Sequence, residues 1–382
     1  MTDIVIRLDP EIFIGSDTIN RAGTICNAIG NRALIATEQA LYESRKIERI
    51  IAVLSDAGVE SIVFDEIPAH ATADVAEAAA ELALGARCST VIAFGGLKTQ
   101  AIARTVAIIA NSKFDLFELI DGRKPPDNFI PLIAIPTTGR DPFLFADYFL
   151  NVDPRDRSVK QIKSPPGLCR AALIDSSLFE SLSEKYAATT AFDGFCTALE
   201  AYCSTRSHFL SDSLLEQAMA IYTQMMDSYA ETQTTYDLAG GATKAGFLMA
   251  MGTAFSAPGI GTALAYALSG KFPVEKSRCS TALLPYILER LVASRPEKIA
   301  RIAALTGEPV AGASVAECAA MTVEGIRRRM GQLQVPARLK DFDLSLDRLA
   351  PVAEAARNLE FVIYSPWTVA SEDAYDLLKQ AY

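Results

Sequence analysis

A carboxylate and a hydroxyl, Asp193 and Thr197, lie four residues apart in a stretch that is predicted to be helical. The apolar residues around them, Phe192, Phe195 and Leu199, recur at the spacing of a buried helix face. Residues separated by roughly one helical turn project from the same side, so the two polar side chains are neighbours. Because burying an unpaired carboxylate is costly, we expect Asp193 to have a partner.

Histidine is rare in this chain. It occurs twice, at His70 and His208, which rules out a metal site built from several imidazoles. We expect His70 to lie on a surface loop and His208 to cap or pack against a helix. The seven cysteines are scattered and form no Cys-x-x-Cys pair, which indicates reduced thiols in a cytoplasmic protein.

The formal net charge is −10, which argues against nucleic acid or an anionic membrane as a partner. No apolar run reaches the roughly 18 residues of a membrane span, and the first residues lack the basic start of a signal peptide. We therefore expect a small-molecule substrate, no nucleic acid and no membrane. We also expect the chain to form a homodimer.

Short apolar runs alternate with helical patterns over the first half of the chain. This alternation predicts a doubly wound, mainly parallel sheet, which would bind ligands at the carboxyl ends of its strands. Residues 148–163 are predicted to form a hairpin. We expect strands at 4–8, 33–37, 61–64, 90–94, 132–135 and 171–174, and helices near 46–58, 72–85 and 98–111.

From about residue 178 onward only helical patterns occur. The chain is long enough for two domains, so we expect an α/β domain over 1–177 and an all-helical domain over 178–382, with a ligand cleft between them. The predicted helices are 178–186, 188–204, 211–230, 240–254, 260–269, 279–293, 296–305, 314–333 and 370–381.

Two glycines, Gly95 and Gly96, end a predicted strand and begin a helix. Such a turn lets a phosphate approach the backbone at a helix N-terminus, and Lys98 and Arg104 add positive charge there. A tight turn with solvated basic residues is an equal alternative. Glu38, after the second strand, could accept a hydrogen bond from a ribose hydroxyl and favour NAD over NADP, or be a plain surface acid.

Seven stretches, in the same order along the chain, resemble motifs of the iron-dependent (group III) alcohol dehydrogenase family. This resemblance implies the dehydroquinate synthase-like fold of that family and NAD or NADP as cofactor. It also implies that Thr137 and Thr138 lie near a pyrophosphate placed over Gly95 and Gly96. The stretches are 63–68, 91–96, 133–138, 190–202, 254–266, 282–285 and 365–382.

The same resemblance identifies where the chain departs from the family. An aspartate at position 193 binds the metal in the family, but its histidine positions hold Thr197, Thr262 and Lys276 here. One carboxylate, two hydroxyls and an ammonium are poor ligands for a divalent ion, so we expect no metal. The third glycine of the phosphate turn is replaced by Leu97, and Phe143 adds bulk to a loop that is small in the family.

Two functional hypotheses follow. The first is a metal-independent, NAD(P)-dependent oxidoreductase for a small alcohol or carbonyl substrate. In it Lys276 contacts Asp193 and polarises the carbonyl, and Tyr266 donates a proton. In the second, Lys276 only neutralises Asp193, and the chain is a non-redox enzyme or a metabolite-binding or structural protein. Retention of Gly95 and Gly96, of Thr137 and Thr138, and of Asp193 favours the first hypothesis. Simultaneous loss of the metal ligands, of the third glycine and of the small loop after Thr138 favours the second.

Overall fold

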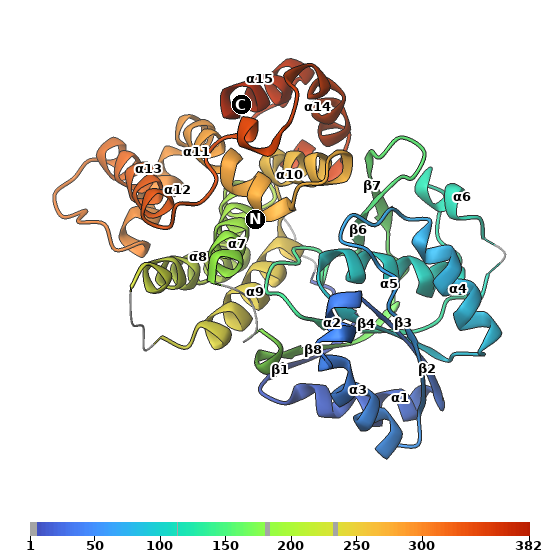
Figure 1. Ribbon diagram of the computed structural model, residues 1–382. Coiled ribbons are helices and arrows are strands. Elements are labelled where there is room, and N and C mark those ends of the chain that lie inside the picture. The colour runs from blue at the N-terminus through green and yellow to red at the C-terminus, as the bar shows by residue number, and fades with distance from the viewer. Residues whose placement is uncertain (1–5, 113, 180–183, 232–235) are drawn as a thin grey trace. The chain divides into compact units, whose positions relative to one another are not determined.

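The computed structural model describes residues 6–112, 114–179, 184–231 and 236–382. The chain divides into two compact units, Met1–Phe179 and Glu180–Tyr382, which are drawn in Figure 1 and described separately below.

The first unit is built on a six-stranded sheet in which every pair of neighbouring strands is parallel. Figure 1 shows helices α1 and α3 on one face of this sheet and α4 and α5 on the other, as expected for a doubly wound fold. The central strand β4, Thr90–Gly95, is buried along its whole length, which explains its continuous apolar sequence. The predicted parallel sheet is confirmed.

The strand order is β1 (Glu11–Gly15), β8 (Cys169–Asp175), β5 (Leu132–Pro136), β4, β2 (Arg32–Thr37) and β3 (Glu60–Phe64). The covering helices are α1 (Ala22–Ile29), α3 (Lys46–Asp56), α4 (Val75–Gly85) and α5 (Leu97–Ile109). Three helices of this unit were not expected from the sequence, namely α1 and the two shorter helices α2 (Gln39–Glu43) and α6 (Leu116–Ile120).

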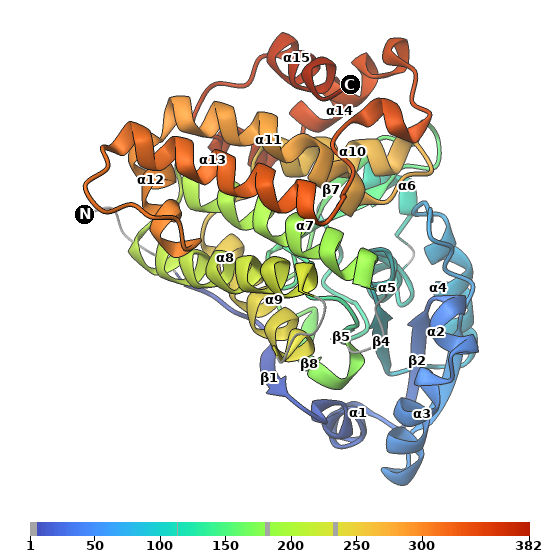
Figure 2. The same ribbon diagram turned by 60° about the vertical axis from the view of Figure 1, so that its left-hand side comes forward.

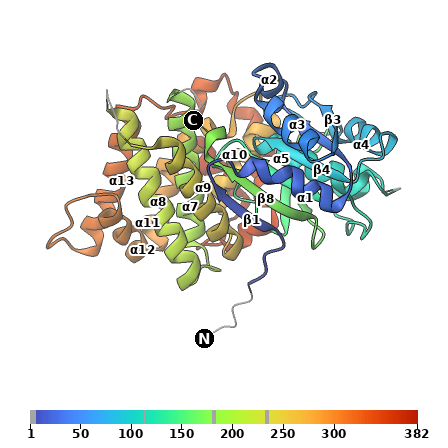
Figure 3. The ribbon, with the colours of Figure 1, turned by 90° about the horizontal axis from the view of Figure 1, so that it is seen from below.

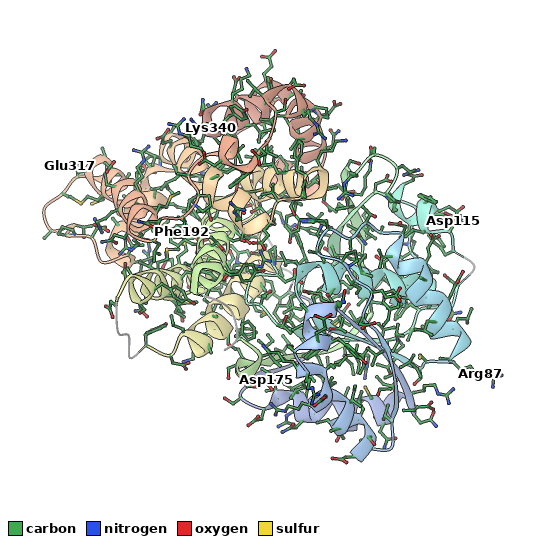
Figure 4. All side chains as sticks on the ribbon, viewed as in Figure 1. Arg87, Asp115, Asp175, Phe192, Glu317 and Lys340 are labelled. Atoms are coloured by element: carbon green, nitrogen blue, oxygen red, sulfur yellow. The ribbon has the colours of Figure 1, made fainter. Side chains whose placement is uncertain are left out.

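The edge strand is not where the sequence pattern suggested. We expected it at residues 4–8, but residues 6–8 form no strand, and residues 4 and 5 lie outside the described residues. The edge strand is β1, which pairs with β8 from Glu11 to Gly15. Both runs are apolar enough to form a strand, so the position of the edge strand depends on which run pairs with β8. Asp175, at the end of β8 and labelled in Figure 4, accepts hydrogen bonds from the Ile19 amide (3.0 Å) and the Asp17 amide (3.1 Å), which holds the chain leaving β1.

The predicted hairpin is present. Strands β6 (Tyr148–Val152) and β7 (Val159–Lys163) pair in antiparallel register. The hairpin is attached to α5, because the Asn151 side chain donates a hydrogen bond to Thr105 Oγ1 over 3.1 Å.

The second unit is helical, and its described residues contain no strand, which confirms the all-helical prediction. Helix α7 packs against α8, α9, α10 and α11 and is therefore its centre, as Figures 2 and 3 show. The helices are α7 (Glu184–Cys203), α8 (Phe209–Ala230), α9 (Leu238–Phe255), α10 (Ile260–Lys271), α11 (Lys276–Ser294), α12 (Pro296–Leu305), α13 (Val315–Gln332), α14 (Ala350–Arg357) and α15 (Ser371–Ala381).

Two helix predictions in this unit need correction. The expected helices 178–186 and 188–204 are replaced by the single helix α7, because no glycine or proline interrupts residues 184–193. Residues 176–178 form a short 3₁₀ turn, and residues 180–183 lie outside the described part of the chain. Helix α14 was not predicted.

Among the described residues no single helix has both the length and the apolar composition needed to cross a membrane. The consecutive helices α9 and α10 meet these criteria only when taken together, and they are bent by 110° at the break between them.

Candidate active site

Helix α7 carries a line of buried polar side chains on one face. Asp193, Thr197 and Glu200 are spaced three to four residues apart and are at most 2% exposed. This spacing points them in the same direction along the helix. Buried polar groups require hydrogen-bond partners, and the partners here come from α10 and α11.

Lys276, the first residue of α11, pairs with Asp193. Its Nζ lies 2.5 Å from Asp193 Oδ1, and the two side chains are 4% and 0% exposed. A helix N-terminus carries a partial positive charge, so an ammonium there is unfavourable. The Asp193 carboxylate compensates this repulsion. The predicted contact between Asp193 and Lys276 is confirmed by this distance.

Tyr266 of α10 is the other neighbour of this ammonium. Lys276 Nζ lies 4.9 Å from the centroid of the Tyr266 ring, a cation–π contact. The ammonium thus meets the face of the ring. That the phenol acts as a proton donor stays a prediction.

Thr197 and Thr262 extend the polar group. Thr262 Oγ1 donates to Glu200 Oε2 over 2.7 Å and lies 3.4 Å from Thr197 Oγ1. Thr197 Oγ1 in turn donates to the Asp193 carbonyl over 3.1 Å. The four positions Asp193, Thr197, Thr262 and Lys276 therefore lie together, as the sequence resemblance implied.

Glu200 has a structural role beside them. Its carboxylate accepts hydrogen bonds from the Gly261 amide (2.6 Å) and the Thr262 amide (2.8 Å), and so caps the N-terminus of α10. Burial raises the pKa of Glu200, and the hydrogen bonds from Thr262 and Gly261 oppose that rise.

The structure adds a large residue that sequence reasoning missed, Tyr222 of α8. Its side chain is fully buried against the backbone of Gly194, where a Cβ would lie 2.3 Å from the Tyr222 ring. Burial, and then the Asp193 carboxylate, raise the pKa of Tyr222 and keep the phenol neutral. The available signal was Gly194 itself, because a glycine inside a helix often leaves room for a neighbour.

The surrounding groups do not form an evident metal site. Among the described residues, no cluster of three or more His, Cys, Asp and Glu side chains could hold a metal ion. The nearest thiols, Cys196 and Cys279, have pKa values raised by burial and by nearby carboxylates, so they are neutral at physiological pH. The donor set of one carboxylate, two hydroxyls and an ammonium does not fit a divalent ion.

The residues predicted to bind a cofactor lie in the first unit, around the N-terminus of α5. Glu38 Oε1 accepts hydrogen bonds from the Gly96 amide (2.8 Å) and from Thr99 Oγ1 (2.9 Å). The Gly96 N–H, which we expected to face a pyrophosphate, is therefore bound to a carboxylate of the chain itself. Sequence periodicity could not reveal this contact, because it joins the backbone of Gly96 to a side chain that lies 58 residues away in the sequence.

Gly95 and the two threonines complete this turn. The Thr137 amide donates to the Gly95 carbonyl over 3.2 Å, which holds the loop after β5 against the loop after β4. A Cβ on Gly96 would lie 3.9 Å from Thr138 Oγ1, so Thr138 is also adjacent. At Gly95 a Cβ would meet Thr99 Oγ1 at 2.6 Å, which explains why this position is a glycine.

Arg104 was expected to add positive charge at the glycine turn, but its side chain lies elsewhere. Its side chain is 6% exposed, lies 3.6 Å from the Asp141 carboxylate and points its guanidinium towards the Leu144 carbonyl. Position 104 is two turns into α5, so its side chain reaches the loop after β5 instead of the helix N-terminus.

Lys98 does lie in the first turn of α5, and two arginines accompany it. Burial, followed by the charges of Arg157 and Arg140, lowers the pKa of Lys98 to about 8. Sequence reasoning missed both arginines. The signal for Arg140 was its position two residues after Thr138, but nothing in the pattern placed the hairpin residue Arg157 nearby.

Both halves of the chain match models of known families. Residues 9–176 match the model described as iron-containing alcohol dehydrogenase. Residues 187–382 match the model described as the C-terminal part of the Fe-containing alcohol dehydrogenase family.

Individual relatives are similar over nearly the whole chain. Choline dehydrogenase of Bacillus subtilis (strain 168) is 23% identical over 346 residues, which is 90% of this chain and 86% of that protein. NAD-dependent methanol dehydrogenase of Bacillus methanolicus is 20% identical over 384 residues, 98% of each chain. The crystal structure of a 1,3-propanediol oxidoreductase superposes with a TM-score of 0.89 at 21% identity, over the full length of both chains. At this identity the likeness is one of fold.

Proposed function

Because the chain belongs to the iron-containing alcohol dehydrogenase family, we propose that it is an NAD(P)-dependent oxidoreductase acting on a small alcohol or carbonyl compound. Relatives named as choline and NAD-dependent methanol dehydrogenases support this reaction class. The nicotinamide would supply or accept the hydride at the carbonyl carbon. The residues of this chain then have to polarise the carbonyl oxygen and supply its proton.

The single observation that carries the proposal is the buried contact between Lys276 and Asp193 at the centre of the second unit. An ammonium held in a water-poor site can stabilise negative charge that develops on a carbonyl oxygen. In this proposal Lys276 provides the positive charge, Asp193 holds it in place, and Tyr266 would donate its phenol proton to the carbonyl oxygen.

We propose that this chemistry needs no metal. The positions that hold histidine in the family are Thr197, Thr262 and Lys276 here, and the ammonium at the last of them is already paired with Asp193. A divalent cation would have to displace or deprotonate Lys276 to reach the carboxylate.

The glycine turn supports NAD as the cofactor. Gly95, Gly96, Lys98, Thr137 and Thr138 are the residues proposed to lie along its pyrophosphate. Glu38, held at the Gly96 amide, would accept a hydrogen bond from the adenosine ribose and repel a 2′-phosphate. We further propose a cytoplasmic homodimer, and the seven free cysteines support the reducing compartment.

Fluorescence titration with NADH and NADPH tests the cofactor, followed by an assay of oxidation and reduction on a panel of small alcohols and carbonyls. Saturable NADH binding together with turnover of at least one substrate is the expected result. If neither dinucleotide binds at millimolar concentration, the dehydrogenase proposal is wrong.

A second candidate is a family member that has lost hydride transfer and binds a metabolite, catalyses a non-redox step or acts structurally. The bond between Glu38 and the Gly96 amide favours it, since a pyrophosphate would compete with that carboxylate. Dinucleotide binding without turnover of any panel substrate would support this candidate over the first.

A further inference from the structure

A surface cleft of the second unit lies along the segment that joins α14 to α15, drawn in red in Figure 1. The cleft encloses about 620 Å³, a volume typical of small-molecule sites. Most of its wall comes from residues 357–369, and Thr205, two residues after the end of α7, completes it. None of the lining residues belongs to the group around Lys276 and Asp193, so the cleft is separate from the candidate active site.

The wall of this cleft carries positive charge. Arg357 is its one charged side chain among the described residues, although the chain has a net charge of −10. The Arg357 Nε donates to the Val369 carbonyl over 3.3 Å, and the two Nη groups have no partner in the described part of the chain. Two such N–H groups side by side match the two oxygens of a carboxylate.

A second arginine lies close by. Arg206 follows Thr205 directly, and its guanidinium lies over the Tyr364 ring, 4.8 Å from the ring centroid. The Tyr364 carbonyl accepts a hydrogen bond from the Thr205 amide over 2.8 Å, which joins the end of α7 to the wall segment. Arg206 has no carboxylate partner within the described ranges, so it adds to the positive potential of this surface.

Two buried polar groups of the wall lack a hydrogen-bond partner in the described residues. They are Ser365 Oγ, in a residue that is 5% exposed, and Trp367 Nε1. An indole N–H can only donate, so the group that it lacks is an acceptor. Both belong to residues 365–370, which form neither helix nor strand and are bonded to Arg357 through the Val369 carbonyl. This irregular loop has to adjust for the two groups to contact a ligand, because both are covered.

We propose that the cleft binds a small monocarboxylate with an apolar body, such as a short fatty acid. The two Nη groups of Arg357 hold the carboxylate, whose oxygens are also the acceptors that the 365–370 loop lacks. Val362 and Ile363 contribute apolar surface to the same wall and would contact the hydrocarbon chain. The site does not depend on hydride transfer.

Tryptophan fluorescence tests the site directly, because Trp367 is the single tryptophan of the chain and lines the cleft. Titration with hexanoate should give a saturable change in wild-type fluorescence, and calorimetry provides a second measurement of the affinity. Hexanamide has the same length but no charge, so it should bind at least about tenfold more weakly. Acetate lacks the apolar body and should also bind more weakly than hexanoate.

Variants locate the binding at the cleft. Arg357→Gln should weaken hexanoate binding at least about tenfold, because the charged hydrogen bonds are lost. Arg357 is exposed, so the variant should fold. Arg338→Gln removes equal charge from another exposed position of the second unit and should bind like the wild type. The proposal is overturned by equal affinities for hexanoate and hexanamide, by wild-type affinity in Arg357→Gln, or by a lack of saturable binding in both measurements.

Discussion

Lys276 Nζ lies 2.5 Å from Asp193 Oδ1, and both side chains are buried in the helical unit. Removing one partner of such a pair leaves an uncompensated charge in the interior. Lys276→Met keeps most of the side-chain volume, so its main effect should come from the Asp193 carboxylate, which would be left buried without a cation. We expect Lys276→Met to lower the free energy of unfolding by about 3–5 kcal/mol, measured by urea denaturation.

The matched control is Lys340→Met, which removes an exposed lysine of the same unit, labelled in Figure 4, and should change stability by less than about 0.5 kcal/mol. Adding Asp193→Asn to Lys276→Met removes the stranded charge and should restore part of the loss. A double variant as unstable as Lys276→Met alone would show that the charge pair is not the cause.

A second prediction concerns metal content. We expect the purified protein to hold no stoichiometric iron, zinc or nickel, and a chelator to leave any activity intact, because the Lys276 ammonium is bonded to Asp193 Oδ1 and the neighbouring Thr197 and Thr262 offer only hydroxyls. Elemental analysis checks this directly. One metal per chain, lost together with activity in Asp193→Ala, would contradict it.

The donor positions can also be tested by gain of function. A variant carrying Thr197→His, Thr262→His and Lys276→His would place three imidazoles beside Asp193, a ligand set suited to zinc or iron. We expect this variant, but not the wild type, to bind one Zn²⁺ in a calorimetric titration. Without such binding, these four positions would not converge on one ion.

A third prediction concerns the choice between NADH and NADPH. Glu38 is held at the Gly96 amide, and its negative charge would repel a 2′-phosphate. Glu38→Gln can keep the hydrogen bond but removes the charge, so the NADH:NADPH affinity ratio should fall about tenfold in fluorescence titration. Glu66→Gln changes an exposed acid nearby and should leave the ratio unchanged. An unchanged ratio in Glu38→Gln would remove Glu38 from the cofactor site.

The periodicity of the sequence was enough to predict the parallel sheet and the helical unit, because buried runs such as Thr90–Gly95 have few alternative structures. The pairing of Asp193 with Lys276 was also predictable, since a buried carboxylate requires a cation and only one was available at the four related positions. Strand β1 was placed wrongly because its location depends on pairing with β8, which the local sequence does not record.

Other site residues could not be predicted, because their positions depend on tertiary packing. The Tyr222 ring of α8 packs against Gly194, the residue after Asp193 in the sequence, because that glycine leaves space for it. Arg157 comes near Lys98 through a hairpin whose turn conformation the sequence does not specify. Arg104 was assigned to the glycine turn on charge alone. Its position on α5 makes the side chain project towards Asp141 instead.

A fourth prediction is the pH dependence of dinucleotide binding, because Lys98 is one of the residues proposed to lie along the pyrophosphate. The pKa of Lys98 is lowered to about 8, so the ammonium is mostly present at pH 7 and mostly lost at pH 9.5. Arg140 and Arg157, whose charges help to lower this pKa, do not titrate in this range, and the Glu38 carboxylate accepts hydrogen bonds from the Gly96 amide and from Thr99. Affinity for NADH, whose pyrophosphate charge is constant in this range, should fall as pH rises through 8.

Lys98→Arg is the control for this pH dependence, because a guanidinium keeps its charge and should give a flat profile. The same lowered pKa has a consequence for stability with the opposite sign. Between pH 8 and the higher pKa of an unfolded lysine, the unfolded chain binds more protons, so this group makes the fold more stable as pH rises. An NADH affinity that is independent of pH in the wild type would exclude Lys98 from the cofactor site.

The last prediction concerns the roles of Lys276 and Tyr266 in turnover. Lys276 Nζ lies 4.9 Å from the Tyr266 ring centroid, and in the proposed mechanism the substrate oxygen contacts both groups. If the ammonium stabilises the oxygen, Lys276→Met should lower kcat about 100- to 1,000-fold, as loss of an oxyanion donor does. If the phenol supplies the proton, Tyr266→Phe should lower kcat about 100-fold or more. Affinity for NADH should change little in either variant, and Tyr286→Phe on α11 should behave as the wild type. Turnover that survives both changes would mean that Lys276 only neutralises Asp193 and that the reaction, if any, occurs without this pair.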